Sequence, residues 1–233
     1  MKFRPFRLSL VGHLFIATLL LSSNGFAQQT LGIDVSHYQG AVNWGQVKQH
    51  GIVFAFAKAT GGTYYTDPEF SANWNGMRAE GIIRGAYHFY YPNEDATQQA
   101  ENFVNVVGKL RKGLDMPPVL DVELTEGMDS SQIQQGVATW LSYVQQKMGC
   151  TPIIYVDPSF ANEYLGDRFS NYPLWVAEYT NAPAPSLPNA WSIWSFWQYS
   201  ETGNVAGVSG AVDQDRYNGS VSNLKNFNNK LCQ

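Results

Sequence analysis

Short apolar runs alternate with longer segments of helical periodicity, and this alternation constrains the fold more than any other feature of the sequence. Eight runs have the length and composition of buried strands: 31–35, 53–59, 85–90, 118–122, 152–156, 174–179, 195–199 and 212–215. The first five are each followed by a segment with a helical pattern: 44–50, 70–80, 96–110, 131–148 and 159–165. We expect no helix after these, because 181–189 is a proline-rich linker and loops join the last three runs.

The alternation of strands and helices predicts parallel strands connected by right-handed crossovers. Eight such strands in about 200 residues favour a closed barrel of the TIM type. Because the helices stop after the fifth strand, we expect an α/β barrel with reduced helices, (β/α)5(β)3. Asn43 and Asp95 are expected N-caps of two helices, and Gly149 is an expected C-cap. A doubly wound open sheet is the main alternative.

Residues 1–27 have the pattern of a secretory signal peptide. A basic start precedes the mostly apolar stretch 8–21, and Gly25 and Ala27 are the small residues expected before a cleavage site. An uncleaved membrane anchor is the alternative, but the apolar stretch is shorter than the roughly 20 residues of a membrane span. We therefore expect export to the periplasm or the extracellular space without stable membrane insertion after cleavage, and one domain over residues 28–233.

Charge and composition exclude several classes of protein. The formal net charge is −4, and no basic patch of the kind used to bind nucleic acid is present. The hydrophobic content of 44% and aromatic content of 14% exclude intrinsic disorder. An exported chain can form disulfides, so we expect Cys150 to pair with Cys232 near the C-terminus, with two separate thiols as the alternative. We expect a monomer.

The fourth apolar run leads into two carboxylates, Asp121 and Glu123. Residues two apart on a strand point to the same face, and barrel enzymes carry their catalytic groups at the C-terminal ends of the strands. Two close carboxylates in apolar surroundings raise the pKa of at least one of them, which yields a proton donor beside an anion. Glycoside hydrolysis uses such a pair. Pairing with a lysine, or capping of the next helix, is the simpler interpretation of an isolated D-x-E.

Three further acids favour a functional site over these simpler interpretations of the D-x-E. Asp34 ends the first run and Asp213 lies in the eighth, and these two runs are neighbours in a closed barrel. Glu178 lies late in the sixth run, on a face that the sequence leaves ambiguous. Several acids at one end of a barrel indicate a metal site or a carboxylate-driven glycosidase. We favour the glycosidase, without metal or other cofactor, because the sequence has no H-E-x-x-H and no paired-cysteine motif.

Histidine and aromatic residues near the strand ends are candidates for substrate contacts. His37 and His88 could donate hydrogen bonds to a substrate there, although a structural role is at least as simple for each. Aromatic side chains combine apolar area with a polar group, which suits sugar rings. Those at or near predicted strand ends are Tyr38, Tyr87, Tyr90, Tyr155, Trp175, Tyr179, Trp197 and Tyr199. Core packing explains any single one, so their density at one end carries the argument.

Seven short motifs follow one another in a recognisable order: 32–40, 56–60, 85–89, 120–123, 174–177, 197–199 and 212–213. In this order they resemble the glycoside hydrolase family 25 lysozymes, the Chalaropsis-type N-acetylmuramidases. The resemblance extends from Leu31 to about Ser220. Two positions depart from it: Asn43 stands where many members have an acid, and Glu178 adds an acid that could alter the pH optimum or the substrate preference.

The resemblance implies a trimmed barrel that cleaves the β-1,4 bond between N-acetylmuramic acid and N-acetylglucosamine in the glycan strands of peptidoglycan. It implies that Glu123 is the general acid. Asp121 would either attack the anomeric carbon or stabilise the substrate's own acetamido group as nucleophile. Asp34 and Asp213 would line the floor of the site. The residues expected to contact substrate are Tyr87, Tyr155, Trp175, Tyr38, His37, Tyr179, Gln198 and Glu178.

Two other functions fit the same residues. The first is a non-catalytic barrel that binds peptidoglycan or chitin, although the presence of all four acids, Asp34, Asp121, Glu123 and Asp213, argues against it. The second is a hydrolase of another amino-sugar polymer such as chitin, because an aromatic cleft does not distinguish between polymers of acetamido sugars.

Overall fold

The computed structural model describes Met1 and residues 29–232, so the predicted signal peptide and its cleavage site lie outside the described residues apart from Met1. Eight strands form a closed ring in which β1 pairs with both β2 and β9. They are β1 (Thr30–Val35), β2 (Phe54–Gly61), β4 (Ile83–Phe89), β5 (Val119–Asp121), β6 (Ile153–Val156), β7 (Leu174–Ala177), β8 (Phe196–Gly203) and β9 (Val212–Tyr217). The predicted barrel is confirmed, and the open sheet is excluded.

The prediction that all strands are parallel is wrong for the last strand, β9. β9 is antiparallel to both of its neighbours, β8 and β1, whereas the other strand pairs of the ring are parallel. The connection between β8 and β9 spans only residues 204–211, which is too short for a crossover to a parallel strand. A two-residue strand, β3 (Tyr65–Thr66), pairs with β2 outside the ring. The barrel is therefore mixed.

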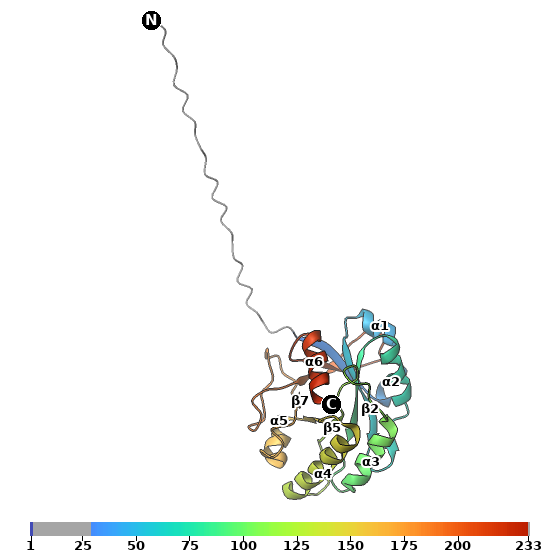
Figure 1. The fold of residues 1–233 in the computed structure, drawn as a ribbon, viewed down its shortest axis with the longest axis vertical. Helices are drawn as coiled ribbons and strands as arrows, with labels where there is room; N and C mark the ends of the chain where they lie inside the picture. The colour runs from blue at the N-terminus through green and yellow to red at the C-terminus, as the bar shows by residue number, and fades with distance from the viewer. Residues whose placement is uncertain (2–28, 233) are drawn as a thin grey trace.

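The five predicted helices are present, and they cover the outside of the barrel over the first part of the chain (Figure 1). They are α1 (Trp44–Gln49), α2 (Phe70–Ala79), α3 (Ala96–Val107), α4 (Ser130–Met148) and the short α5 (Pro158–Phe160), which continues as the π-helix η2 (Ala161–Leu165). The carboxamide of Asn43 and the carboxylate of Asp95 accept backbone N–H groups at the first turns of α1 and α3. Gly149 ends α4 with a φ of 68°, a left-handed conformation that favours glycine.

The expectation that no helix follows the fifth is wrong, because the chain ends in a sixth helix, α6 (Val221–Leu231). Leu224 is fully buried against the barrel interior, and the ring of Phe227 packs edge-on to Phe196 and Tyr217. Phe196 begins β8 and Tyr217 ends the antiparallel β9, so α6 closes the end of the barrel at which the parallel strands begin. A disulfide between Cys150 and Cys232, as predicted, ties the end of α6 to the segment before β6.

The core has two parts that follow the alternation of side chains along the strands. Inward-facing aromatic residues fill the barrel; among them Phe56 stacks on Trp175 at a centroid distance of 4.3 Å. Outward-facing residues pack against the helices, with Phe103 of α3 and Trp140 of α4 fully buried between the two layers. The strands that the helices cover are therefore buried on both of their sides, by the barrel interior on one and by the helices on the other.

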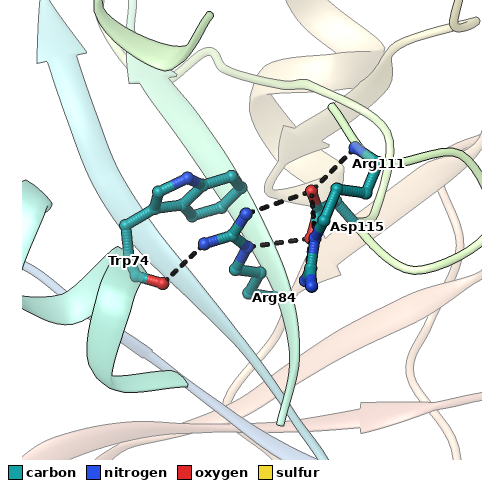
Figure 2. A network of polar contacts seen from close by, with 4 residues as sticks. All are labelled: Trp74, Arg84, Arg111 and Asp115. Carbon is teal, nitrogen blue, oxygen red and sulfur yellow. Dashed lines mark hydrogen bonds and ion pairs between the residues drawn. The ribbon is translucent and has the colours of Figure 1, made fainter. Parts of the chain in front are cut away.

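A buried ion pair anchors the loop that enters β5 (Figure 2). The Arg84 guanidinium of β4 donates to both carboxylate oxygens of Asp115, at 2.8 and 3.2 Å, and stacks on the Trp74 ring at 3.7 Å. Burial alone would raise the pKa of Asp115, but the hydrogen bonds from Arg84 and Arg111 hold it below its usual value. This network therefore positions the strand that ends at Asp121.

Candidate active site

A pocket opens at the rim where the parallel strands end and where the antiparallel β9 begins. The residues that line it are Asp34, Val35, Ser36, Tyr38, Gln39, Lys58, Tyr87, Phe89, Asp121, Glu123, Tyr155, Trp175, Gln198 and Asp213. All four predicted catalytic acids are in this set, together with five of the eight predicted substrate contacts. The C-terminal ends of the strands therefore bring together side chains that are up to 179 residues apart, from Asp34 to Asp213.

Asp121 and Glu123 form an unequal pair in this pocket. Asp121 is the last residue of β5 and is buried, whereas Glu123 lies two residues beyond the strand and is exposed. Burial and then the charge of Glu123 raise the pKa of Asp121 well above its usual value, against the opposing charge of Lys58. Desolvation by the surrounding protein also raises the pKa of Glu123, although Tyr155 and Lys58 partly oppose it. Both groups therefore retain a proton to higher pH than free carboxylic acids.

A second group of acids meets between β1 and β9. Asp34 and Asp213 are direct partners in the antiparallel register. Burial is the largest cause of the raised pKa of Asp34, followed by repulsion from Asp215 and Asp213. The pKa of Asp213 is raised to about 6, by burial and then by the charge of Glu201. Asp34, Asp213 and Asp215 therefore carry fewer than three negative charges between them at pH values near the pKa of Asp213.

Asp215 is a member of this acidic group that the sequence analysis missed. It is fully buried, and its Oδ1 accepts a hydrogen bond from Trp175 Nε1 at 2.9 Å. Burial raises its pKa well above the usual value. Its spacing of two from Asp213 was the available signal, because residues two apart on a strand share a face. Trp175, expected to contact substrate, is buried beneath the pocket and holds this acid.

Gln198 connects the two sides of the pocket. Its Nε2 donates to Asp34 Oδ2 at 2.8 Å, and its Oε1 accepts the hydroxyl protons of Tyr155 and Tyr179, each at 2.8 Å. The side chain is buried, so these three contacts are made inside the protein. Gln198 was expected to bind substrate, whereas in this structure its amide is occupied by an acid and two tyrosines.

Lys58 places a cation among the acids, and the sequence analysis did not single it out. It lies on β2, two residues after the inward-facing Phe56, and its Nζ is 4.3 Å from the centroid of the Phe89 ring. Its charge lowers the pKa of both Asp121 and Glu123, against the larger effect of burial. The alternation of side chains along the 56–60 motif was sufficient to place this lysine at the rim.

Comparisons with known proteins identify the family. The sequence model of glycosyl hydrolases family 25 matches residues 33–208. The chain belongs to this family. It is 40% identical to Lysozyme M1 of Streptomyces globisporus over 204 residues, which cover 83% of this chain and 69% of that protein. It is 32% identical to N,O-diacetylmuramidase of Chalaropsis sp over 210 residues, which cover 83% of this chain and 96% of that protein. The fold matches the crystal structure of the bacterial lysozyme from Streptomyces coelicolor with a TM-score of 0.82 and 39% identity, over 86% of this chain and 97% of that one.

As a member of family 25, the protein is a glycoside hydrolase.

The two histidines that the sequence analysis named as candidates, His37 and His88, do not line the pocket. His88 is fully buried behind β4, with Nδ1 2.7 Å from Thr60 Oγ1 and Nε2 3.1 Å from Gln99 Oε1. Burial lowers the pKa of His88 to about 4, so the ring is neutral at physiological pH. His37 Nδ1 lies 2.8 Å from Asp67 Oδ2. His88 is therefore structural in this family 25 barrel.

Glu178 and Tyr179 also lie outside the lining of the catalytic pocket. The Glu178 carboxylate accepts the backbone N–H of Ser186 at 2.5 Å, which ties it to the proline-rich loop. Tyr179 is 51% exposed and lines an adjacent groove, while its hydroxyl donates to Gln198. Within the part of the chain that the structure describes, no group of three or more His, Cys, Asp and Glu side chains could hold a metal ion.

Proposed function

We propose that this family 25 glycoside hydrolase is an N-acetylmuramidase, a lysozyme that hydrolyses the β-1,4 bond between N-acetylmuramic acid and N-acetylglucosamine in peptidoglycan. The observation that carries the proposal is the pair Asp121 and Glu123 in an acid-rich pocket at the rim of the barrel. The similarity to Lysozyme M1 and to N,O-diacetylmuramidase supports peptidoglycan as the polymer.

In the proposed mechanism Glu123 is the general acid. It is exposed, so a bound glycan can reach it, and its raised pKa keeps a proton available for the leaving glycosidic oxygen. The positive charge of Lys58 limits the rise in the pKa of Glu123, so Glu123 can still release its proton. The conjugate base then accepts a proton from the incoming water.

Asp121 acts next to Glu123 on the sugar that is cleaved. Two chemistries fit its position: attack on the anomeric carbon, and stabilisation of the substrate's acetamido group as the nucleophile. Peptidoglycan whose muramic acid lacks the N-acetyl group separates them. Cleavage of that polymer supports direct attack by Asp121, and its loss, with the N-acetylated polymer still cleaved, supports participation of the acetamido group.

The remaining lining residues hold the sugar and tune the charge. Tyr38 is 82% exposed at the rim, where its ring offers a face to a pyranose. Tyr87 and Tyr155 lie near the reacting sugar, and burial raises the pKa of each, so both stay protonated. Asp34 and Asp213 line the floor, and the negative charge that this acidic group shares favours the positive charge that develops on the sugar.

The proposal includes export of the protein. The basic and apolar pattern of residues 1–27 supports a signal peptide, and the mature domain would span residues 28–233 as a monomer. In the described residues, no helix is both long and apolar enough to span a bilayer.

The test is digestion of purified peptidoglycan by the purified protein, with Glu123→Gln beside it. The matched control is Glu126→Gln, an exposed acid three residues away and outside the pocket. Products are reduced with borohydride and read by mass spectrometry. We expect muropeptides ending in reduced N-acetylmuramic acid from the wild type and from the control, but not from Glu123→Gln.

Other outcomes reassign the activity. Ends of reduced N-acetylglucosamine would show that a different bond is cleaved. Binding to peptidoglycan without release of any product would favour the non-catalytic barrel. Release from chitin, with intact peptidoglycan, would favour another amino-sugar polymer.

A further inference from the structure

A second groove lies beside the catalytic pocket, on the outer face of β8 and β9. In the described residues no helix connects β7 to β8 or β8 to β9, so this face of the barrel lacks the outer layer that the connecting helices form over the earlier strands. The residues that line the groove are Tyr179, Thr180, Asn181, Ala182, Pro183, Trp197, Tyr199, Ser200, Glu201, Thr202, Gln214 and Arg216. The groove is therefore polar, with aromatic residues and one charge of each sign.

Arg216 is the distinctive residue of this groove. Its guanidinium lies over the Tyr199 ring at 4.2 Å and near the Trp197 ring at 5.2 Å from the centroids. Nη1 donates to Gln29 Oε1 at 3.2 Å. Among the described residues, Arg216 forms no ion pair with an acidic side chain. A guanidinium stacked on an aromatic ring presents its edge as a planar donor for a carboxylate.

The same stacking argues against a sugar in the groove. A pyranose binds an aromatic residue through the face of the ring, and the guanidinium of Arg216 already covers Tyr199. Glu201, which is exposed in the groove, supplies a carboxylate for an amino group. One guanidinium and one carboxylate in a polar groove match a ligand that carries both carboxylate and ammonium groups.

The groove adjoins the catalytic pocket. Tyr179 lines the groove, and its hydroxyl donates to Gln198, which lines the pocket. On β9, Gln214 faces the groove while its neighbour Asp213 faces the pocket. A substituent on a sugar in the catalytic pocket therefore has a short path across the rim into the groove.

We propose that this groove binds the stem peptide of peptidoglycan, with Arg216 holding a peptide carboxylate and Glu201 facing a peptide amino group. The inference rests on the proposed muramidase function, because the stem peptide is attached to the lactyl group of N-acetylmuramic acid. The occupant is thus part of the substrate, and the groove selects glycan strands that still carry peptides.

The experiment compares two defined substrates, tetrasaccharides of alternating N-acetylglucosamine and N-acetylmuramic acid with and without tetrapeptide stems. Arg216→Gln should lower kcat/KM about tenfold on the stem-bearing substrate, the loss expected for one charge-assisted contact. It should leave kcat/KM on the peptide-free substrate unchanged. Arg216→Lys keeps the charge without the planar donor, so its kcat/KM on the stem-bearing substrate should lie between those of the wild type and Arg216→Gln.

The matched control is Arg168→Gln. Arg168 is exposed, whereas Arg216 is half-buried, and like Arg216 it lies near an aromatic ring, that of Phe169 at 5.7 Å, but it lines neither the pocket nor the groove. Equal losses on both substrates would overturn the proposal, because Arg216 would then act through the fold or the catalytic pocket. Unchanged rates of Arg216→Gln on both substrates would overturn it as well. A wild-type protein that cleaves neither substrate would instead refute the muramidase function.

Discussion

Asp34 and Asp213 lie directly opposite each other on the antiparallel strands β1 and β9. Two aspartates in such a pair repel each other when both are ionised, and the buried Asp215 two residues further along β9 adds to the repulsion. This arrangement exists because β9 reverses direction and brings its first residues to the rim where β1 ends. The electrostatics of the pocket therefore depend on the direction of one strand.

The first prediction concerns the pH dependence of catalysis. Asp213→Asn removes a negative charge that raises the pKa of Asp34 and of Asp121. Both groups should then ionise at lower pH, so the acid limb of the kcat/KM profile on peptidoglycan should move to lower pH. Asp167→Asn is the control, because Asp167 is exposed and lines neither the pocket nor the adjacent groove, so its removal should leave the acid limb in place. An acid limb that stays in place, or moves upward, would contradict this account.

The second prediction concerns stability. The pKa of Asp213 is raised to about 6 in the folded protein, so folding favours its protonated form. The ionised form then costs stability as the pH rises from about 4 to above 6. Asp213→Asn should stabilise the protein near pH 7.5 by on the order of 2 kcal/mol, or about 5 °C in Tm, and little near pH 4. Thermal unfolding at both pH values measures this, and an equal gain at both would count against it.

A third prediction follows from the contacts of Gln198. Gln198→Leu leaves Asp34 Oδ2 and the hydroxyls of Tyr155 and Tyr179 without their shared partner. Asp34 and Tyr155 are buried, and an unsatisfied buried polar group costs about 1–3 kcal/mol, so we expect a loss of stability and a fall in kcat of at least about tenfold. Tyr179→Phe removes one of the three contacts and should have a smaller effect. Kinetics of Gln198→Leu equal to those of the wild type would refute this role.

The buried pair Arg84 and Asp115 gives a fourth prediction. Asp115→Asn leaves the Arg84 guanidinium buried without its counter-ion and should destabilise the protein by about 3–5 kcal/mol near pH 7. Because the pKa of Asp115 is lowered in the folded state, its contribution is present at neutral pH and is lost as the pH falls below 4. Urea unfolding should show the difference narrowing in acid. The exposed Asp167→Asn is the control.

The fifth prediction tests the closure of the barrel by α6. Leu224→Ala removes a fully buried side chain from the end of the barrel and should cost about 2–4 kcal/mol. Lys225→Ala, the exposed neighbour on the same helix, should cost far less. Denaturant unfolding compares the two variants. Because α6 lies at the end opposite the pocket, kcat should be unchanged in both, and a selective fall in kcat would contradict this placement.

Much of the fold and of the site follows from local patterns. Asn43 and Asp95 cap their helices as predicted, because capping depends on a side chain and the backbone a few residues away. Asp121 and Glu123 could be recognised for a similar reason, since an apolar run and a two-residue spacing are enough to place both at a strand end. Lys58 and Asp215 carry the same signal of alternation and could have been found with it.

The number and order of the barrel strands, the five covering helices and the acidic pair could be predicted from the sequence, because these depend on periodicity within about twenty residues. The structure was needed for the direction of β9, because β8 extends to Gly203 and leaves only residues 204–211 to connect it to β9. It also decided that α6 closes the barrel and that the amide of Gln198 is bound to Asp34. These contacts join residues far apart in the chain, and only packing of the whole barrel selects them.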